Sequence, residues 1–347
     1  MVAATSQIPV IECKGTDLEI GRAHGEAARE LIARGLGQWR ENLAAQRGDP
    51  HAYVARFLAQ TSFQDAIARF TPDLLEELHG IAEGSGQEFD LILAYNLMDE
   101  EWSFRTGKLD GMAPGCTVVA IAGKAIAQTM DIPTMHDGTQ IVLAIEPEKG
   151  PAQRVFTAAG MLGLNGANHA GVGVVVNNLS QSPSAATGLP VACVMRRILS
   201  HQSADAAGRW IESVPHAVGQ HYLIGDPTEL ISIEGAANGT FRVPVSDHYV
   251  HTNHPLPNHE TRPETAEIER VSNTRARFDR ATHLATDASD QDDLQRILED
   301  CEAPISRAPK SGFMTFGGTS IGLSVPPTVR VTPGPPHETP WTEISWK

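Results

Sequence analysis

Cysteine is scarce in this chain of 347 residues: there are four, at the widely separated positions 13, 116, 193 and 301. No two of them form a CxxC pair, and residues 1–15 lack a basic segment followed by a long apolar run. We therefore predict neither a secretory signal nor a disulfide framework, and expect a cytoplasmic protein whose cysteines are reduced thiols. One of these thiols could then serve as a nucleophile.

Long apolar runs and positive charge are also lacking. No stretch approaches the roughly 18 uninterrupted apolar residues of a membrane-spanning helix. The formal net charge of −15 disfavours nucleic acids and anionic membranes as partners, because both bind basic surfaces. With 41% hydrophobic and 20% charged residues, the composition is that of a globular protein with a substantial core. The composition does not decide whether the protein forms a homo-oligomer.

The pattern of the chain changes after Cys116. A first strand is expected at 8–13, but residues 17–98 otherwise show mainly helical periodicity, and a loop is expected over 102–115. Beyond Cys116, short β-type segments alternate with turn residues and a few helices. The expected strands are 117–122, 125–131, 140–146, 153–158, 171–177, 220–224, 230–234, 240–243, 249–251, 312–324 and 328–332. The expected helices are 188–200, 203–212, 263–286 and 290–301. This order predicts an α+β architecture of packed layers, in one continuous domain of residues 1–347.

Cys116 stands at the head of a predicted β-hairpin. Val118–Ala122 and Ala125–Met130 are apolar segments joined by a Gly123-Lys124 turn, and Asp131 ends the second one. A cysteine in such a place is often an inert core residue. Other residues further along the chain favour a nucleophile instead.

Gly318-Thr319-Ser320-Ile321-Gly322 matches the GxSxG pattern of a serine nucleophile elbow. That mechanism requires an acidic residue and then a histidine after the serine. The only downstream histidine is His337, with no carboxylate between it and Ser320. We therefore reject a serine hydrolase.

Three histidines at positions 251, 254 and 259 suggest a zinc site. However, Pro255 and Pro257 prevent a regular helix from presenting them together. We predict no metal ion and no organic cofactor.

Several short motifs, taken together, resemble one known family. They are Gly115-Cys116-Thr117, Asp131, Asn177, His251-Thr252-Asn253-His254 and Ser272-Asn273-Thr274-Arg275. The pattern resembles the acyl-coenzyme A:6-aminopenicillanic acid acyltransferase family, also classed as peptidase family C45, among the N-terminal-nucleophile hydrolases. The likeness runs through GTDLEIGRAHGE, APGCT, AGMLGLNGANHAGVGVVVNNL, GLPVACVMRRIL, HYLIGDPTELISIE, VHTNHPL and VTPGPP, in that order. It implies a four-layer αββα sandwich in which the nucleophile begins a central strand.

The resemblance also implies that the protein is made as a precursor and cuts its own chain. The cut would fall between Gly115 and Cys116, giving a mostly helical fragment 1–115 and a fragment 116–347. Cys116 would then carry a free α-amine, whose pKa of about 8 suits it to activate the neighbouring thiol. Attack of the thiolate on an amide carbonyl would give an acyl-enzyme.

The remaining roles are also implied by the resemblance. Asp131 corresponds to the carboxylate that orients the α-amine, and Asn253 to the side chain that donates to the oxyanion. Arg275 corresponds to an arginine that pairs with the carboxylate near the cysteine, with Arg277 as the competing choice. The residues expected to contact substrate are Asn177, Thr117 and Thr274.

The resulting prediction is a self-processing cysteine amidohydrolase. Its partner would be a small-molecule amide such as an N-acyl amine, a lactam or a short peptide-like compound. Two alternatives stay open: an acyl-coenzyme A-dependent N-acyltransferase, and a non-catalytic binding protein with the same fold. Val118 stands where the fungal acyltransferases carry a hydroxyl residue, so the resemblance does not extend to penicillin as the substrate.

Overall fold

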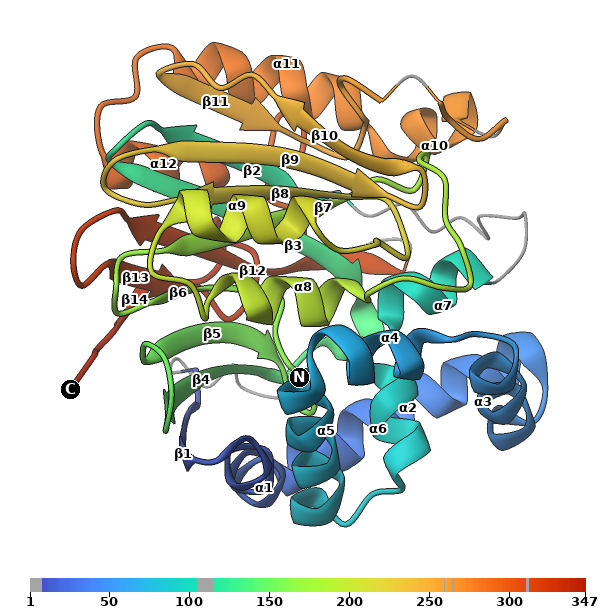
Figure 1. Cartoon of the computed structure of the whole chain (residues 1–347). Coiled ribbons are helices and arrows are strands. Elements are labelled where there is room, and N and C mark those ends of the chain that lie inside the picture. Colours follow the sequence, from blue (N-terminus) through green and yellow to red (C-terminus); the bar gives the residue numbers. More distant parts are fainter. Residues whose placement is uncertain (1–7, 105–114, 259, 264, 310–311) are drawn as a thin grey trace.

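Two β-sheets pack face to face between layers of helices (Figure 1). This computed structural model describes residues 8–104, 115–258, 260–263, 265–309 and 312–347. One sheet has the strand order β1-β4-β5-β6-β7-β8-β9-β10 and the other β11-β2-β3-β12-β13-β14. Strands β3 and β7 contact each other across the interface between the sheets.

Among the described strands, β1 alone pairs in parallel, with β4, and the other strand pairs are antiparallel. The first sheet consists of β1 (Val10–Gly15), β4 (Gln140–Pro147), β5 (Gln153–Ala158), β6 (Asn165–Asn168), β7 (Gly173–Asn178), β8 (Gln220–Gly225), β9 (Leu230–Ala236) and β10 (Gly239–Val243). The second consists of β11 (His248–His251), β2 (Thr117–Ile121), β3 (Ala125–Pro133), β12 (Phe313–Gly322), β13 (Thr328–Val331) and β14 (Thr342–Ile344). β2 and β3 are buried along their whole length, which explains why both read as continuous apolar segments rather than alternating ones.

Helices cover the outer face of each sheet. Helices α8 (Val191–Ile198) and α9 (Ala204–Glu212) pack on the first sheet, and α11 (Thr274–Ala285) and α12 (Gln291–Leu298) pack on the second. Helix α10 (Thr265–Ser272) precedes α11. The predicted four-layer αββα arrangement is therefore confirmed.

The N-terminal helices gather at one end of the sandwich, beside β1 and β4 (Figure 1). They are α1 (Asp17–Ala27), α2 (Arg29–Arg47), α3 (Pro50–Ala59), α4 (Phe63–Phe70), α5 (Pro72–Ser85), α6 (Phe89–Tyr95) and α7 (Met98–Phe104). Helices α1 and α5 cross so closely that a Cβ atom at Gly21 would lie 2.0 Å from the carbonyl oxygen of Glu77. Close packing thus accounts for the glycines inside α1. No helix in the described part of the chain combines the length and apolar character needed to cross a bilayer.

The hairpin predicted after Cys116 is confirmed. β2 and β3 pair from Thr117 opposite Thr129 to Ile121 opposite Ala125, and Gly123 supplies the turn with φ of 66°. On the other side of β3, β12 pairs antiparallel and carries a bulge between Thr315 and Gly317. This bulge lies beside Asp131, which pairs with Thr315. The fold therefore places the beginning of β2 and the end of β3 together at an irregular point of the sheet.

Some elements differ from the sequence-based expectations. Residues 263–286 form two helices rather than one, because Asn273 adopts a left-handed conformation between α10 and α11. Strands β6 and β14 were not expected. Helix α7 extends into the start of the loop expected over 102–115, whose residues 105–114 lie outside the described part of the chain. The division of the chain into fragments 1–115 and 116–347 stays a prediction.

Candidate active site

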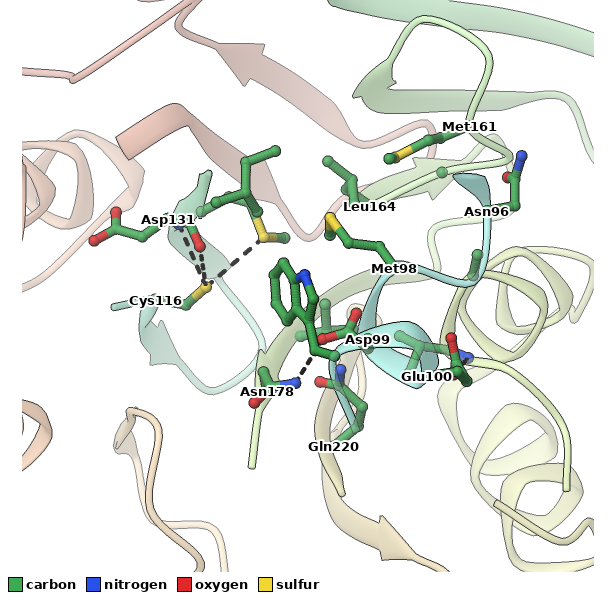
Figure 2. A pocket seen from close by; sticks show the side chains of 17 residues that line it. Asn96, Met98, Asp99, Glu100, Cys116, Asp131, Met161, Leu164, Asn178 and Gln220 are labelled. Atoms are coloured by element: carbon green, nitrogen blue, oxygen red, sulfur yellow. Dashed lines mark hydrogen bonds between the residues drawn. The ribbon is translucent and has the colours of Figure 1, made fainter. Parts of the chain in front are cut away.

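Cys116 is the residue immediately before β2, and its side chain is buried with 3% of its surface exposed. Its Sγ accepts a hydrogen bond from the backbone N–H of Asp131 at 3.4 Å, and lies 3.7 Å from Sδ of Met130 (Figure 2). The hairpin register produces both contacts, since Thr117 pairs with Thr129 and the two strand ends then meet. The thiol is therefore held at a fixed position beside the end of β3.

The carboxylate of Asp131 is fully buried and held by two residues that are distant in sequence. Thr315 donates its hydroxyl to Oδ1 at 2.6 Å, and Nε of Arg307 lies 3.5 Å from Oδ2. Among the described residues, Oδ2 has no hydrogen-bond partner. A Cβ atom at Gly115 would lie only 2.4 Å from Oδ2. The backbone at Gly115 therefore passes directly against the carboxylate, in a space that only glycine fits.

Burial raises the pKa of the Cys116 thiol to about 12, and the negative charge of Asp131 adds to this effect. The N–H of Asp131 and the guanidinium of Arg277 act in the opposite direction without cancelling it. Burial also raises the pKa of Asp131, against the effect of Arg307. The thiol is thus protonated at neutral pH and needs a base before it can act as a nucleophile.

Arg277 is a fully buried arginine on α11 that contacts the start of β2. Its Nη1 donates to the carbonyl oxygen of Cys116 at 2.6 Å and to Oγ1 of Thr117 at 2.9 Å. Its Nη2 donates to Oδ1 of Asn253 at 2.9 Å. Burial lowers the pKa of Arg277 to about 10, so the guanidinium keeps its charge at neutral pH. It joins three of the residues that the sequence singled out.

The expectation that Arg275 lies near the cysteine is wrong. Its side chain is 65% exposed and pairs with Glu269 at 2.7 Å. The two arginines are two positions apart on α11, which places them on opposite sides of the helix. Arg277 takes the buried position, and Arg307 rather than an arginine of α11 is the one that pairs with Asp131.

Asn253 follows β11 in a buried segment that Thr274 fixes. The hydroxyl of Thr274 accepts a hydrogen bond from the backbone N–H of Asn253 at 2.8 Å. Nδ2 of Asn253 donates to the carbonyl oxygen of Asn178 at 3.0 Å. Thr117 and Thr274 therefore position Arg277 and Asn253, and neither lines the cavity beside Cys116. Their contact with substrate stays a prediction.

Asn177 points away from that cavity. Its Oδ1 lies 2.8 Å from Nδ1 of His221, in a buried polar cluster between the sheets. Because side chains alternate along β7, its neighbour Asn178 lines the cavity instead. Contact between Asn177 and substrate therefore has no support from the cavity lining, and it stays a prediction.

The cavity beside Cys116 has a volume of about 40 Å³, and its walls are mainly apolar (Figure 2). Its apolar lining comes from Met98, Trp102, Met130, Ile132, Met161, Leu164, Val176, Val191 and Ala192. The polar lining comes from Asn96, Asp99, Glu100, Cys116, Asp131, Asn178 and Gln220.

Sequence reasoning missed Arg307, Asn178, and the acidic residues Asp99 and Glu100. Arg307 belongs to no motif, and its partner Asp131 is distant in sequence. The sequence did contain a signal for the two acidic residues. They directly follow the apolar run ILAYNLM, which spans α6 and the start of α7, and charged residues are unusual next to such a run.

The histidines that suggested zinc are engaged in hydrogen bonds. Nε2 of His251 lies 3.0 Å from Oε1 of Glu234, and Nδ1 of His254 lies 3.0 Å from Oγ1 of Thr274. His259 lies outside the described residues. Within the described part of the chain, no group of three or more His, Cys, Asp or Glu side chains is arranged to hold a metal. Ser320, the other rejected candidate, lies inside β12 and is fully buried.

Comparison with known proteins identifies the family. Residues 121–321 match the model of the acyl-coenzyme A:6-aminopenicillanic acid acyl-transferase family, and this match includes Asp131, Asn253 and Arg277 while beginning after Cys116. The chain belongs to this family. That membership confirms the predicted enzyme class, which is an amide hydrolase or an acyltransferase.

One curated relative is the acyl-coenzyme A:6-aminopenicillanic-acid-acyltransferase 40 kDa form of Emericella nidulans. It is 28% identical over 280 residues, which cover 79% of this chain and 76% of that protein. Among solved structures, a penicillin V acylase from Agrobacterium tumefaciens is 16% identical, covering 66% of this chain and 86% of its own, with a TM-score of 0.43. A conjugated bile acid hydrolase from Clostridium perfringens is 12% identical, covering 66% and 97% respectively, with a TM-score of 0.41.

The positions of the two arginines lead to a prediction about stability. Changing Arg277→Lys should lower the free energy of unfolding by about 2–4 kcal/mol, because one ammonium cannot satisfy all the buried acceptors around Cys116, Thr117 and Asn253. Arg275→Lys should change it by about 0.5 kcal/mol or less, because its ion pair with Glu269 is exposed. Urea unfolding followed by circular dichroism, with both changes made in a Cys116→Ala chain, measures the difference. Equal effects at the two positions would contradict the assignment of Arg277 to the site.

Proposed function

We propose that this protein is a self-processing cysteine amidohydrolase that cuts its own chain between Gly115 and Cys116 and then hydrolyses small amides through Cys116. One observation carries the proposal. The backbone at Gly115 lies against the buried Asp131 carboxylate, whose Oδ2 has no hydrogen-bond partner among the described residues, and the Cys116 thiol follows one residue later. The thiol of Cys116, the carboxylate of Asp131 and the bond proposed to be cut therefore lie close together.

The proposed self-processing uses the groups at these positions. Sγ of Cys116 attacks the carbonyl carbon of Gly115, and its proton passes through Asp131 to the nitrogen of Cys116. The C–N bond then breaks and leaves a thioester between Gly115 and Sγ. Water hydrolyses this thioester, releasing a carboxylate on Gly115 and a free amine and thiol on Cys116. The raised pKa of the buried thiol supports the need for a carboxylate as base in the first step.

Turnover of an amide uses the new amine. The α-amine of Cys116 takes the proton of the thiol, and Asp131 orients it through the unpartnered Oδ2. Sγ attacks the substrate carbonyl, and the ammonium returns the proton to the leaving nitrogen as the C–N bond breaks. Water then attacks the thioester, releases the acid and regenerates the thiol.

Asn253 and Arg277 support the charge that develops on the substrate oxygen. One N–H of Nδ2 of Asn253 donates to the carbonyl oxygen of Asn178, which leaves the second N–H for an oxyanion. Arg277 fixes Oδ1 of the same side chain and the carbonyl oxygen of Cys116, so that donor and nucleophile share one rigid support. Asn253 is thus the oxyanion donor, and Arg277 is a positioning residue.

The acyl-enzyme could also pass its acyl group to an amine, which is the reaction named in the family description. We favour hydrolysis because water needs no second binding site, and the described cavity of about 40 Å³ suits a small substrate. The substrate is accordingly a small amide.

Denaturing electrophoresis tests the processing step. The wild-type protein should separate into a fragment ending at Gly115 and one beginning at Cys116. Cys116→Ala, which lacks the nucleophile, should migrate as one chain of 37.3 kDa and show no amidase activity. A single full-length band for an active wild-type protein would contradict self-processing.

Gly115→Ala tests whether the contact with Asp131 governs the cut. The added methyl group would lie 2.4 Å from Oδ2 of Asp131 and 2.9 Å from Nη2 of Arg307, so the bond must move away from the carboxylate. We expect processing to slow by about 10-fold or more, measured as the rate at which full-length chain disappears after synthesis.

The matched control is Gly37→Ala in α2, where an added Cβ meets nothing within 4 Å. It should process at the wild-type rate. If Gly115→Ala matures as fast as this control, the carboxylate contact has no part in the cut.

A further inference from the structure

We propose that the cavity beside Cys116 selects amides whose acyl chain ends in a protonated amine, which Asp99 and Gln220 bind. This inference rests on the proposed function and adds its substrate class. The cavity wall opposite the cysteine is rich in hydrogen-bond acceptors.

Asp99, Glu100 and Gln220 line one side of the cavity (Figure 2). Oδ1 of Asp99 accepts a hydrogen bond from Nδ2 of Asn178 at 2.5 Å, and Oε1 of Glu100 accepts one from the backbone N–H of Val191 at 2.9 Å. No lysine or arginine is among the described residues that line the cavity. A carboxylate buried in an apolar cavity without a cation is costly, and such a group is normally paired.

Gln220 supplies an independent observation. Its side chain is 1% exposed, and its Oε1 is buried with no hydrogen-bond partner among the described residues. Buried acceptors are nearly always satisfied, so an unsatisfied one that lines a cavity points to a donor that arrives with the ligand. An ammonium group has three donors and no acceptor, and therefore matches both Gln220 and Asp99.

The geometry of the reaction assigns this amine to the acyl side of the substrate. Figure 2 shows Cys116 between Asp131 on one side and Asp99 with Gln220 on the other. The leaving nitrogen must face the α-amine of Cys116, and hence Asp131, because it takes its proton there. The acyl chain then extends in the opposite direction, past apolar residues such as Met98 and Leu164, towards Asp99. Trp102 belongs to the same lining, and aromatic rings attract a cation placed over their face.

The test compares three para-nitroanilides that differ at one end of the acyl chain: δ-aminovaleryl, hexanoyl and adipoyl. The first two have nearly the same shape and differ in charge, and the third carries a carboxylate. With processed wild-type enzyme, kcat/KM for the δ-aminovaleryl compound should exceed that for the hexanoyl compound by about 10- to 100-fold. The adipoyl compound should be the poorest substrate, because its charge repels Asp99.

Asp99→Asn should bring the ratio of kcat/KM for the amino and alkyl compounds close to one. The control is Asp90→Asn, the same change at an exposed position on α6, which should leave the ratio at its wild-type value. A wild-type preference for the hexanoyl or adipoyl compound would overturn the proposal, and so would an unchanged ratio in Asp99→Asn. If a chain with a free Cys116 hydrolyses no amide at all, the proposed function itself fails, and the substrate class fails with it.

Discussion

A single buried guanidinium connects the parts of this molecule that matter for its chemistry. Arg277 is among the largest side chains that are completely buried, and it contacts the backbone of Cys116, the hydroxyl of Thr117 and the amide of Asn253. These groups lie at the start of β2 and in the segment after β11, and Arg277 itself belongs to α11. A charge this deep is stable only when its donors are satisfied, so the surrounding backbone has little freedom to move. The proposed nucleophile and the proposed oxyanion donor are thereby held in one rigid unit.

Asp131 is likewise a buried charged residue that contacts from distant segments hold in place. Its carboxylate is buried at the end of β3, beside a bulge in β12, with Thr315 and Arg307 on one oxygen each. Oδ2 has no hydrogen-bond partner among the described residues, and it lies against Gly115. In the precursor that we propose, the peptide bond between Gly115 and Cys116 lies next to Oδ2. In the proposed mature enzyme, the α-amine of Cys116 lies there. One carboxylate can therefore act in both processing and turnover.

The sequence predicts the layers and the hairpin well because both depend on local patterns. Gly123-Lys124 between two apolar segments is sufficient to place Cys116 beside Asp131. The choice between Arg275 and Arg277 could not be made in the same way, because it depends on where α11 begins. That boundary is set by the left-handed Asn273, which single-sequence periodicity does not reveal.

Arg307 and Asn178 were missed because their roles arise from contacts between distant segments. In addition, a shift of one residue along β7 decides whether Asn177 or Asn178 lines the cavity. Strand β6, with the sequence NGAN, lacks the β-branched residues that usually mark a strand.

The central claim is that Cys116 becomes an N-terminal nucleophile that carries the acyl group. Mass spectrometry of the purified protein, mixed with an amide substrate and quenched in acid, tests it directly. We expect the larger fragment to begin at Cys116 and to gain the mass of the acyl group on its N-terminal peptide, in a form that hydroxylamine removes as it does a thioester. An active protein with an uncut Gly115–Cys116 bond, or an acyl group on any other residue, would contradict the account.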